Sequence, residues 1–322
     1  MLKATSLFAG CGGADCGMLG NFEFNKIKYS RLPFELSYVI DINEKAINTH
    51  KLNFSCENVV VGDICDVSVD SVPDSDLVVG GFPCQSFSTV NPTKDPFDER
   101  ANLYKEMVRF VKAKQPRVFI AENVKGFMTL HRGSIIKKVR EAFENAGYAV
   151  YTSLMNAADY GVPQRRERVF MVGVRNDISA AYTFPLPVTA KNPVPLSVAV
   201  PLLAIEEKKY YFSERAVQGM KNAKNNMKRG LAQNLNEPCL TVTSHLAKVS
   251  LNSRDPVLLV DPDKELYRRF TPREAARIQS FPDTFAFAGG DLDTYRQIGN
   301  AIAPVMFWHI AKSISDFLAN QC

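Results

Sequence analysis

The chain has 322 residues, of which 46% are hydrophobic and 23% charged, which excludes a disordered polypeptide and suffices for one large domain plus a smaller one. The net charge of +5 is mild, so its distribution matters more than its size. No signal peptide is visible and no apolar run approaches the ~20 residues of a membrane helix, so we expect no membrane association. The seven cysteines lack CxxC spacing, which favours a reduced, cytoplasmic protein without structural zinc.

Seven short segments are predicted as strands because they are mostly rich in β-branched or aromatic residues and are bounded by Gly, Asn, Asp or Pro. Apolar residues at helical spacing predict a helix over Asn102–Lys114 and another that is capped by Ser134 and stops at Gly147. Apolar strands that alternate with helices predict an α/β fold, with a mainly parallel sheet covered by helices on both faces. The predicted strands are Ala4–Ala9, Ser37–Asp41, Asn58–Ile64, Asp76–Phe82, Arg117–Asn123, Tyr151–Asn156 and Arg168–Val174.

The alternation of strands and helices stops near Ala180. Prolines then recur, and the chain is irregular and polar through about Val260. Regular helical patterns return at Pro272–Phe281 and Pro304–Ala319. We therefore predict a catalytic and cofactor-binding domain in residues 1–180, a smaller inserted domain in residues 181–266, and C-terminal helices in residues 267–322 that return to the first domain.

The first predicted strand ends in a glycine-rich turn, SLFAGCGGADCGM (Ser6–Met18). Glycines let the backbone approach a ligand closely, and an acidic residue that closes the next strand, here Asp41, would hold ribose hydroxyls. The segment Asn21–Glu35 has the character of an insertion and lengthens the spacing to Asp41 beyond the usual ~20 residues. Asp63 closes the third strand and is placed to meet the adenine end of a nucleoside. No GxxxxGK[ST] motif is present, which argues against ATP chemistry, while a dinucleotide site stays open as an alternative.

The stretch GGFPCQSFS (Gly80–Ser88) follows a predicted buried strand, at the end where open α/β sheets bind ligands. Pro83 restrains the backbone there and leaves Cys84 accessible, as a nucleophile requires. A small buried thiol in a turn is the alternative interpretation of Cys84.

Six motifs occur in one order along the chain: FAGCGG in the glycine-rich turn, GGFPCQSFS, AENVKGF (Ala121–Phe127), QRRERVF (Gln164–Phe170), RRFTPREAARIQSFPD (Arg268–Asp283) and QIGNAIAP (Gln297–Pro304). In this order they resemble the cytosine-5 DNA methyltransferases over nearly the whole chain. The resemblance implies a Rossmann-like S-adenosylmethionine-dependent methyltransferase fold with a small inserted target-recognition domain.

The resemblance also implies the reaction and its partners. A methyl group would pass from S-adenosylmethionine to carbon 5 of a cytosine flipped out of a short duplex DNA sequence, with S-adenosylhomocysteine as the product and no metal. We expect a monomeric modification enzyme of a bacterial restriction–modification system, paired in function with an endonuclease.

The chemistry explains the residue types in these motifs. Carbon 5 of cytosine is a poor nucleophile until a group adds to carbon 6, and the soft thiolate of Cys84 suits that step. The attack builds negative charge into the ring, which Glu122 can relieve at ring nitrogen 3 if burial raises its pKa. The resemblance places Arg168 and Arg166 near the carbonyl oxygen of the base, where a guanidinium stabilises charge and orients Glu122. Alternate spacing puts Gln164 on the same face as both arginines if the segment is extended.

The resemblance assigns the cofactor site residue by residue. Phe8 would stack on adenine, while Asp41 and Asp63 would hold the ribose and the adenine. Asp41 stands where the family usually has Glu, and Ala301 replaces a common Ser, so both positions depart from the family pattern. The predicted cofactor residues are Phe8, Gly10, Cys11, Gly12, Gly13, Asp41, Ile42, Asp63, Ile64, Pro83, Leu103, Asn300 and Ala301.

Two segments are predicted to meet DNA. Ser86–Arg100 is predicted to be a loop that closes over the flipped base. Lys208–Arg254 holds nine basic and two acidic residues, 9 − 2 = +7, which favours contact with phosphates over an ordinary solvated surface. The predicted DNA-binding residues are Ser88, Thr89, Lys221, Lys224, Lys228, Arg229 and Ser244.

Three alternatives compete with this interpretation. A tRNA cytosine-5 methyltransferase would keep the chemistry, but that branch of the family carries a CFT signature where this chain has Pro238–Thr241, PCLT. An inactive DNA-binding homologue would lose catalytic groups, whereas Cys84, Glu122 and Arg168 are all present. Amino-group methyltransferases carry a [DNS]PP[YFW] motif where this chain has Phe82–Gln85, FPCQ.

Overall fold

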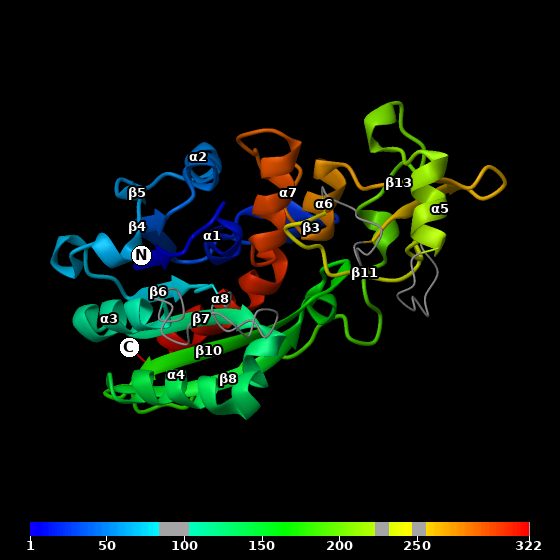
Figure 1. The fold of residues 1–322 in the computed structure, drawn as a ribbon. Helices are drawn as coiled ribbons and strands as arrows, with labels where there is room; N and C mark the ends of the chain where they lie inside the picture. The colour runs from blue at the N-terminus through cyan, green and yellow to red at the C-terminus, as the bar shows by residue number, and fades with distance from the viewer. Residues whose placement is uncertain (84–102, 223–231, 247–255, 322) are drawn as a thin grey trace.

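A seven-stranded sheet forms the centre of the computed structural model, which describes residues 1–83, 103–222, 232–246 and 256–321 (Figure 1). The strand order is β5-β4-β1-β6-β7-β10-β8. β5, β4, β1, β6 and β7 are parallel neighbours, and β10 runs antiparallel between β7 and β8, so the prediction of a mainly parallel sheet is confirmed. The strands are β1 (Leu2–Leu7), β4 (Phe34–Asp41), β5 (Val59–Val61), β6 (Leu77–Gly80), β7 (Val118–Val124), β8 (Tyr148–Asn156) and β10 (Glu167–Arg175).

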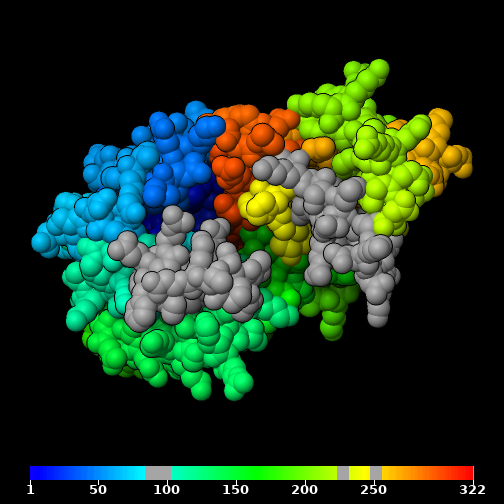
Figure 2. Space-filling view, in the orientation of Figure 1, coloured from blue at the N-terminus to red at the C-terminus, as the bar shows by residue number. Residues whose placement is uncertain are grey.

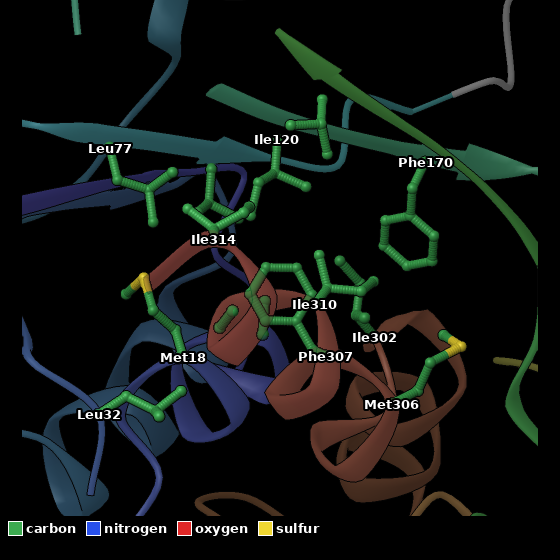
Figure 3. Packing of buried hydrophobic residues seen from close by; sticks show 14 of the residues in the cluster. Met18, Leu32, Leu77, Ile120, Phe170, Ile302, Met306, Phe307, Ile310 and Ile314 are labelled. Carbon is green, nitrogen blue, oxygen red and sulfur yellow. The ribbon is translucent and has the colours of Figure 1, made fainter. Parts of the chain in front are cut away.

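Helices cover both faces of the sheet because successive strand residues point to opposite sides. Val78 and Phe119 pack in one core cluster with α3 (Leu103–Lys114) and α4 (Ser134–Glu144). The neighbouring strand residues Val79 and Ile120 pack in a second cluster with α1 (Gly13–Leu19) and α8 (Pro304–Ala319). Figure 3 shows the α8 residues Phe307, Ile310 and Ile314 directed toward strand residues such as Leu77 and Ile120. Each such fully buried side chain stabilises the fold by about 1.5–3 kcal/mol.

The helix boundaries follow the sequence closely, with three differences. α4 ends at Glu144, three residues before the predicted stop at Gly147. α4 begins at Ser134, but its N-cap is Gly133 in a left-handed conformation (φ 79), so the prediction that Ser134 caps the helix is wrong. α6 (Pro272–Ile278) begins as predicted, with a capping box between Thr271 and Glu274, and ends three residues before Phe281. α8 has the predicted bounds.

The segment Asn21–Glu35 contains a hairpin that packs on the C-terminal helix, and its last two residues begin β4. The strands of the hairpin are β2 (Phe22–Phe24) and β3 (Ile27–Tyr29). Tyr29 meets the Trp308 ring of α8 edge to face at 5.2 Å, and Trp308 Nε1 donates to Ser30 O at 3.0 Å. This predicted insertion is therefore an ordered part of the core, and it also gives Trp308 a hydrogen-bond partner.

The inserted region is irregular, as predicted, and shares a core with the helices that follow it. Leu196, Val242 and Leu258 pack in one cluster with Phe270 and Ile278, so contacts run across residue 266. No helix within the four described ranges is long and apolar enough to cross a membrane. The remaining elements are α2 (Glu44–Asn53), β9 (Gln164–Arg165), α5 (Glu214–Asn222), β11 (Cys239–Leu240), β12 (Leu258–Asp261), β13 (Leu266–Arg268) and α7 (Asp291–Asn300).

Candidate active site

A cavity of ≈ 1360 Å³ opens at the carboxyl ends of the parallel strands. β4 and β6 flank β1 on opposite sides, because the chain adds β4 and β5 on one side of β1 and then returns to add β6 on the other. A crevice forms at such a reversal of strand order, and open α/β sheets bind their ligands there. Figure 2 shows this recess where the N-terminal segments (blue), α7 (orange-red) and the yellow segment of the insert meet. The predicted residues that line the cavity are Phe8, Gly10, Cys11, Gly13, Asp41, Ile42, Asp63, Ile64, Pro83, Leu103, Glu122, Arg166, Arg168, Ser244, Asn300 and Ala301.

Asp41 connects the end of β4 to the glycine-rich turn. Its Oδ2 accepts from Gly10 N at 2.8 Å, and its Oδ1 accepts from Asn43 N at 2.8 Å. Burial raises the pKa of Asp41, and the two backbone hydrogen bonds partly oppose that shift. A carboxylate has about four acceptor positions, so these two bonds leave capacity for ribose hydroxyls. A Cβ at Gly10 (φ 56) would meet no atom within 4 Å, so the cavity is open above this residue.

Gly12 differs from the other predicted cofactor residues because it does not line the cavity. A Cβ at Gly12 would lie 2.4 Å from the Phe54 ring and 2.9 Å from the His50 ring, so only glycine fits behind the turn. His50 Nε2 bonds Asp15 Oδ2 at 2.9 Å, and both side chains are fully buried. This pair joins α1 to α2 beneath the turn. The structure therefore places Gly12 in a packing position behind the turn, and its contact with the cofactor stays a prediction.

The adenine end of the predicted site combines apolar and acidic groups. Ile42 follows β4 with 70% of its surface exposed. Asp63 Oδ1 accepts from Cys65 N at 2.9 Å and so fixes the turn after β5, where Ile64 is buried. Phe8 has a left-handed backbone (φ 54), a strained conformation that costs about 1–3 kcal/mol and is concentrated at functional sites. These residues fit a nucleoside, whose flat base needs apolar contacts and whose ribose needs acceptors.

Glu122 and Arg168 form an ion pair at the other end of the cavity. Because β7 and β10 are antiparallel neighbours, Arg168 Nε lies 3.0 Å from Glu122 Oε1, and the side chains are only 12% and 13% exposed. Burial raises the pKa of Glu122, while the charge of Arg168, and after it that of Arg166, opposes the rise. A Cβ at Gly81 would lie 3.1 Å from Glu122 Oε2, so this glycine lets the carboxyl group approach the backbone that leads to Cys84.

Asn123 fixes the end of β6 to the end of β7. Its Nδ2 donates to Phe82 O at 3.0 Å, and its Oδ1 accepts from Val124 N at 2.9 Å. Asn123 is 5% exposed, so these partners satisfy a buried amide. Asn123 is not among the predicted site residues, although an amide inside an apolar strand indicates a need for buried hydrogen-bond partners. Pro83 lines the cavity, and Cys84 lies outside the described residues.

A closed ring of buried hydrogen bonds joins the QRRERVF motif, the insert and the end of α7. Gln164 Oε1 accepts from Val242 N at 2.8 Å, and Gln164 Nε2 donates to Gln279 Oε1 at 2.5 Å. Gln279 Nε2 donates to Ala301 O at 2.5 Å. Arg166 closes the ring by donating to Val242 O at 2.9 Å and Ala301 O at 3.0 Å. The ring holds the insert segment 241–244 as one wall of the cavity.

The alternation expected in this motif is observed, because Gln164 and Arg166 are buried, Arg168 lines the cavity, and Arg165 is exposed. The guanidinium of Arg166 also donates to Gly299 O at 2.8 Å, so Arg166 holds three backbone carbonyls. Its position indicates that Arg166 organises the wall of the cavity, beside the Glu122–Arg168 pair.

The predicted DNA-binding residues are only partly described. Ser244 lines the cavity, whereas Lys221 forms an ion pair with Glu265 inside the insert. In the described ranges, no group of three or more His, Cys, Asp or Glu side chains could hold a metal ion. The predicted closing loop Ser86–Arg100 and the residues Ser88, Thr89, Lys224, Lys228 and Arg229 lie outside the described residues.

Comparison with known proteins identifies the family. The family profile described as C-5 cytosine-specific DNA methylase matches residues 2–316. The Type II methyltransferase M.FnuDI of Fusobacterium nucleatum is 31% identical over 351 residues, which cover 99% of this chain and 96% of that protein. The Type II methyltransferase M.BspRI of Lysinibacillus sphaericus is 34% identical over 352 residues, which cover 98% of this chain and 82% of that protein.

Two solved structures share the fold. The Dnmt2 methyltransferase of S. pombe has a TM-score of 0.77 at 18% identity and covers 99% of each chain. A prophage-encoded E. coli protein described as a DNA modification methyltransferase has a TM-score of 0.77 at 23% identity and covers 99% of this chain and 100% of that chain. Both likenesses confirm the predicted methyltransferase fold. The profile match and the curated relatives go further: this chain belongs to the C-5 cytosine-specific DNA methylase family and is a DNA (cytosine-5)-methyltransferase.

Proposed function

We propose that this methyltransferase modifies a cytosine flipped out of duplex DNA, through a covalent adduct between Cys84 and carbon 6 of the base. The observation that carries this proposal is the buried pair of Glu122 and Arg168, which lies at the end of the strand beside the one leading into Cys84. The family and the fold imply S-adenosylmethionine as the methyl donor, which supplies an electrophilic methyl group when bound. Asp41, the open space above Gly10 and the exposed Ile42 fit its nucleoside and amino-acid parts.

The side chains support the following order of bond changes. The Cys84 thiolate adds to carbon 6, and the electron pair displaced from the 5,6 double bond moves into the ring. Glu122, whose pKa burial raises, gives a proton to ring nitrogen 3, and Arg168 stabilises the negative charge at the base oxygen. Carbon 5 then accepts the methyl group. A water molecule accepts the carbon 5 proton, and the electron pair of that C–H bond re-forms the 5,6 double bond and expels the Cys84 thiolate. Ring nitrogen 3 returns its proton to Glu122.

We assign Arg166 a positioning role within this mechanism. Its buried guanidinium bonds to carbonyl groups of the insert and of the chain that follows α7. Those bonds support the segment 241–244 beside the pocket for the flipped base, whereas Arg168 is the arginine paired with Glu122.

We further propose the cellular setting. Residues 181–266 would act as the target-recognition domain, because their net positive charge suits DNA phosphates. The Type II relatives favour a bacterial modification enzyme. We propose that it acts as a cytoplasmic monomer and pairs in function with a restriction endonuclease. S-adenosylhomocysteine would be the second product, and the mechanism above uses no metal.

The proposal is tested by the variant Cys84→Ser, with Cys56→Ser as the matched control. Cys56 is a half-buried thiol that bonds Asn58 O and does not line the cavity. Cys84→Ser should abolish methyl transfer to DNA while DNA and cofactor binding stay measurable, because the hydroxyl is a far weaker nucleophile. Cys56→Ser should retain the wild-type rate. Appreciable turnover by Cys84→Ser would overturn the nucleophile assignment.

A further inference from the structure

A basic run without any acidic residue follows the strand that carries Glu122. Residues 125–140 contain five lysines and arginines and neither Asp nor Glu, so their net charge is 5 − 0 = +5. The insert segment Lys208–Arg254 contributes +7, and the whole chain carries +5, so the remaining residues carry 5 − 5 − 7 = −7. The positive charge of this protein is therefore concentrated in two segments, and only one of them belongs to the insert.

The run begins at the mouth of the active-site cavity. Two short 3-10 helices, η5 (Lys125–Met128) and η6 (Leu130–Gly133), carry it from β7 to α4. Thr129, Leu130 and His131 line the same cavity as Glu122 and Arg168. Figure 1 shows α4 and the insert helix α5 at opposite ends of the molecule. The two positive segments are therefore available to different parts of one bound polyanion.

The segment is anchored on its inner side and charged on its outer side. Phe127 is fully buried, as are Val139 and Phe143 of α4. His131 and Arg132 both have left-handed backbones, with φ of 46° and 58°, although neither is glycine. Such conformations persist only where the surrounding structure holds them, and they are concentrated at binding and catalytic sites.

Three of the five basic side chains are available to a ligand. Lys125 pairs with Glu167 at 2.8 Å, and Arg140 pairs with Glu144 at 2.7 Å. The other three are exposed, and among the described residues none of them forms an ion pair. They are Arg132, Lys137 and Lys138.

We propose that Arg132, Lys137 and Lys138 form a second DNA-binding surface, which holds the phosphate backbone of the duplex at the catalytic side of the cleft, away from the insert. This inference rests on the proposed function, in which duplex DNA is the substrate. Phosphate contacts position a duplex without reading its sequence. The surface therefore increases affinity for target and non-target DNA equally and leaves sequence choice to the insert.

The test measures DNA affinity against salt concentration for the triple variant Arg132→Gln/Lys137→Gln/Lys138→Gln. Each phosphate contact contributes about 0.9 to the slope of log affinity against log salt, so three lost contacts should lower the slope by about 2.7. Affinity at 0.1 M salt should fall by roughly a few hundredfold, because 10 to the power 2.7 is about 500, for duplexes with and without the target sequence alike. At saturating DNA, kcat and cofactor affinity should keep their wild-type values.

The matched control removes the same amount of charge from β1, β3 and α2, with Lys3→Gln/Lys28→Gln/Lys51→Gln. These lysines are exposed and do not line the active-site cavity, so the control should keep the wild-type slope. Equal slopes for the wild type and the Arg132 triple variant would overturn the proposal. So would a loss of affinity confined to target-containing DNA.

Two further readouts separate the possible failures. If the triple variant loses cofactor binding, the single variant Arg132→Gln decides the question, since its slope should fall by about 0.9 and an unchanged slope would refute the contact. Failure of the proposed function would appear as a wild-type enzyme that transfers no methyl group to DNA, a result independent of the salt slope.

Discussion

Gly299 lies where the insert packs most closely on α7, and adding one methyl group there should disturb catalysis. An alanine Cβ would lie 2.2 Å from Ser244 N, 2.2 Å from the Thr243 carbonyl carbon and 2.5 Å from its oxygen. Favourable contacts of this kind begin near 3.5 Å, so the segment Thr243–Ser244 must move by roughly 1 Å. The obstructing atoms belong to the backbone, so no side-chain rotation can relieve the clash.

This displacement should act on the chemistry more than on the cofactor. The same segment lines the cavity, and Gly299 O is held by Arg166, so the wall beside the flipped base shifts. A misplacement of about 1 Å can lower the rate of a positioned reaction by about a hundredfold. Gly299→Ala should therefore lower kcat/KM for methylation of a target duplex by about a hundredfold, while the contact of Asp41 with Gly10 stays intact and the cofactor Kd changes less.

The control for this variant is Gly290→Ala on the same helix. A Cβ at Gly290 would meet no atom within 4 Å, and its φ is −86°, so the change should cost at most about 1 kcal/mol of helix capping. The assay compares initial rates of methyl transfer with cofactor affinity from calorimetry. Wild-type kcat/KM in Gly299→Ala would refute the claim that the insert segment forms a wall of the active site.

Three further predictions concern buried charges. The protonated form of Glu122 is lost as the pH rises through its raised pKa, so kcat/KM should fall on the alkaline side of the pH profile. Arg168 is the group that most lowers the pKa of Glu122, so Arg168→Met should move the alkaline limb to higher pH. An unmoved limb would contradict the assignment. Arg268→Met should lower the free energy of unfolding, measured in urea, by about 3–5 kcal/mol because it leaves the buried carboxylate of Glu274 without its partner. Adding Glu274→Gln should recover part of the loss, and a loss below about 1 kcal/mol in the single variant would argue against a structural ion pair. Asp41→Asn replaces one of the two carboxylate oxygens that accept hydrogen bonds from backbone N–H groups, and it should weaken cofactor binding about tenfold in calorimetry. A wild-type affinity would contradict this prediction.

The central sheet could be predicted because its inner strands, such as β1, β6 and β10, are short and mostly apolar runs that need burial. The β6 residues Leu77–Gly80 are all buried, and their apolar composition predicts this burial. The position of Glu122 at a strand end follows from the same pattern. The hairpin over residues 22–29 could not be predicted, because its stability comes from contact with Trp308, 279 residues after Tyr29 in the chain (308 − 29 = 279).

The partners of the buried polar groups could not be predicted from sequence. Gln164 and Gln279 meet only after the insert returns to the catalytic side, and Asp15 meets His50 only when α1 and α2 pack together. The family resemblance places Arg166, together with Arg168, near the carbonyl oxygen of the base. Only the fold shows that the guanidinium of Arg166 holds backbone carbonyls.

The most direct test of the central claim is transfer of labelled methyl from S-adenosylmethionine to unmethylated duplex DNA, with tRNA in parallel and bisulfite sequencing of the DNA product. The account predicts methyl groups on carbon 5 of one cytosine within a short DNA motif, and none on tRNA. Methyl groups on tRNA alone, or on neither nucleic acid while binding is intact, would contradict it.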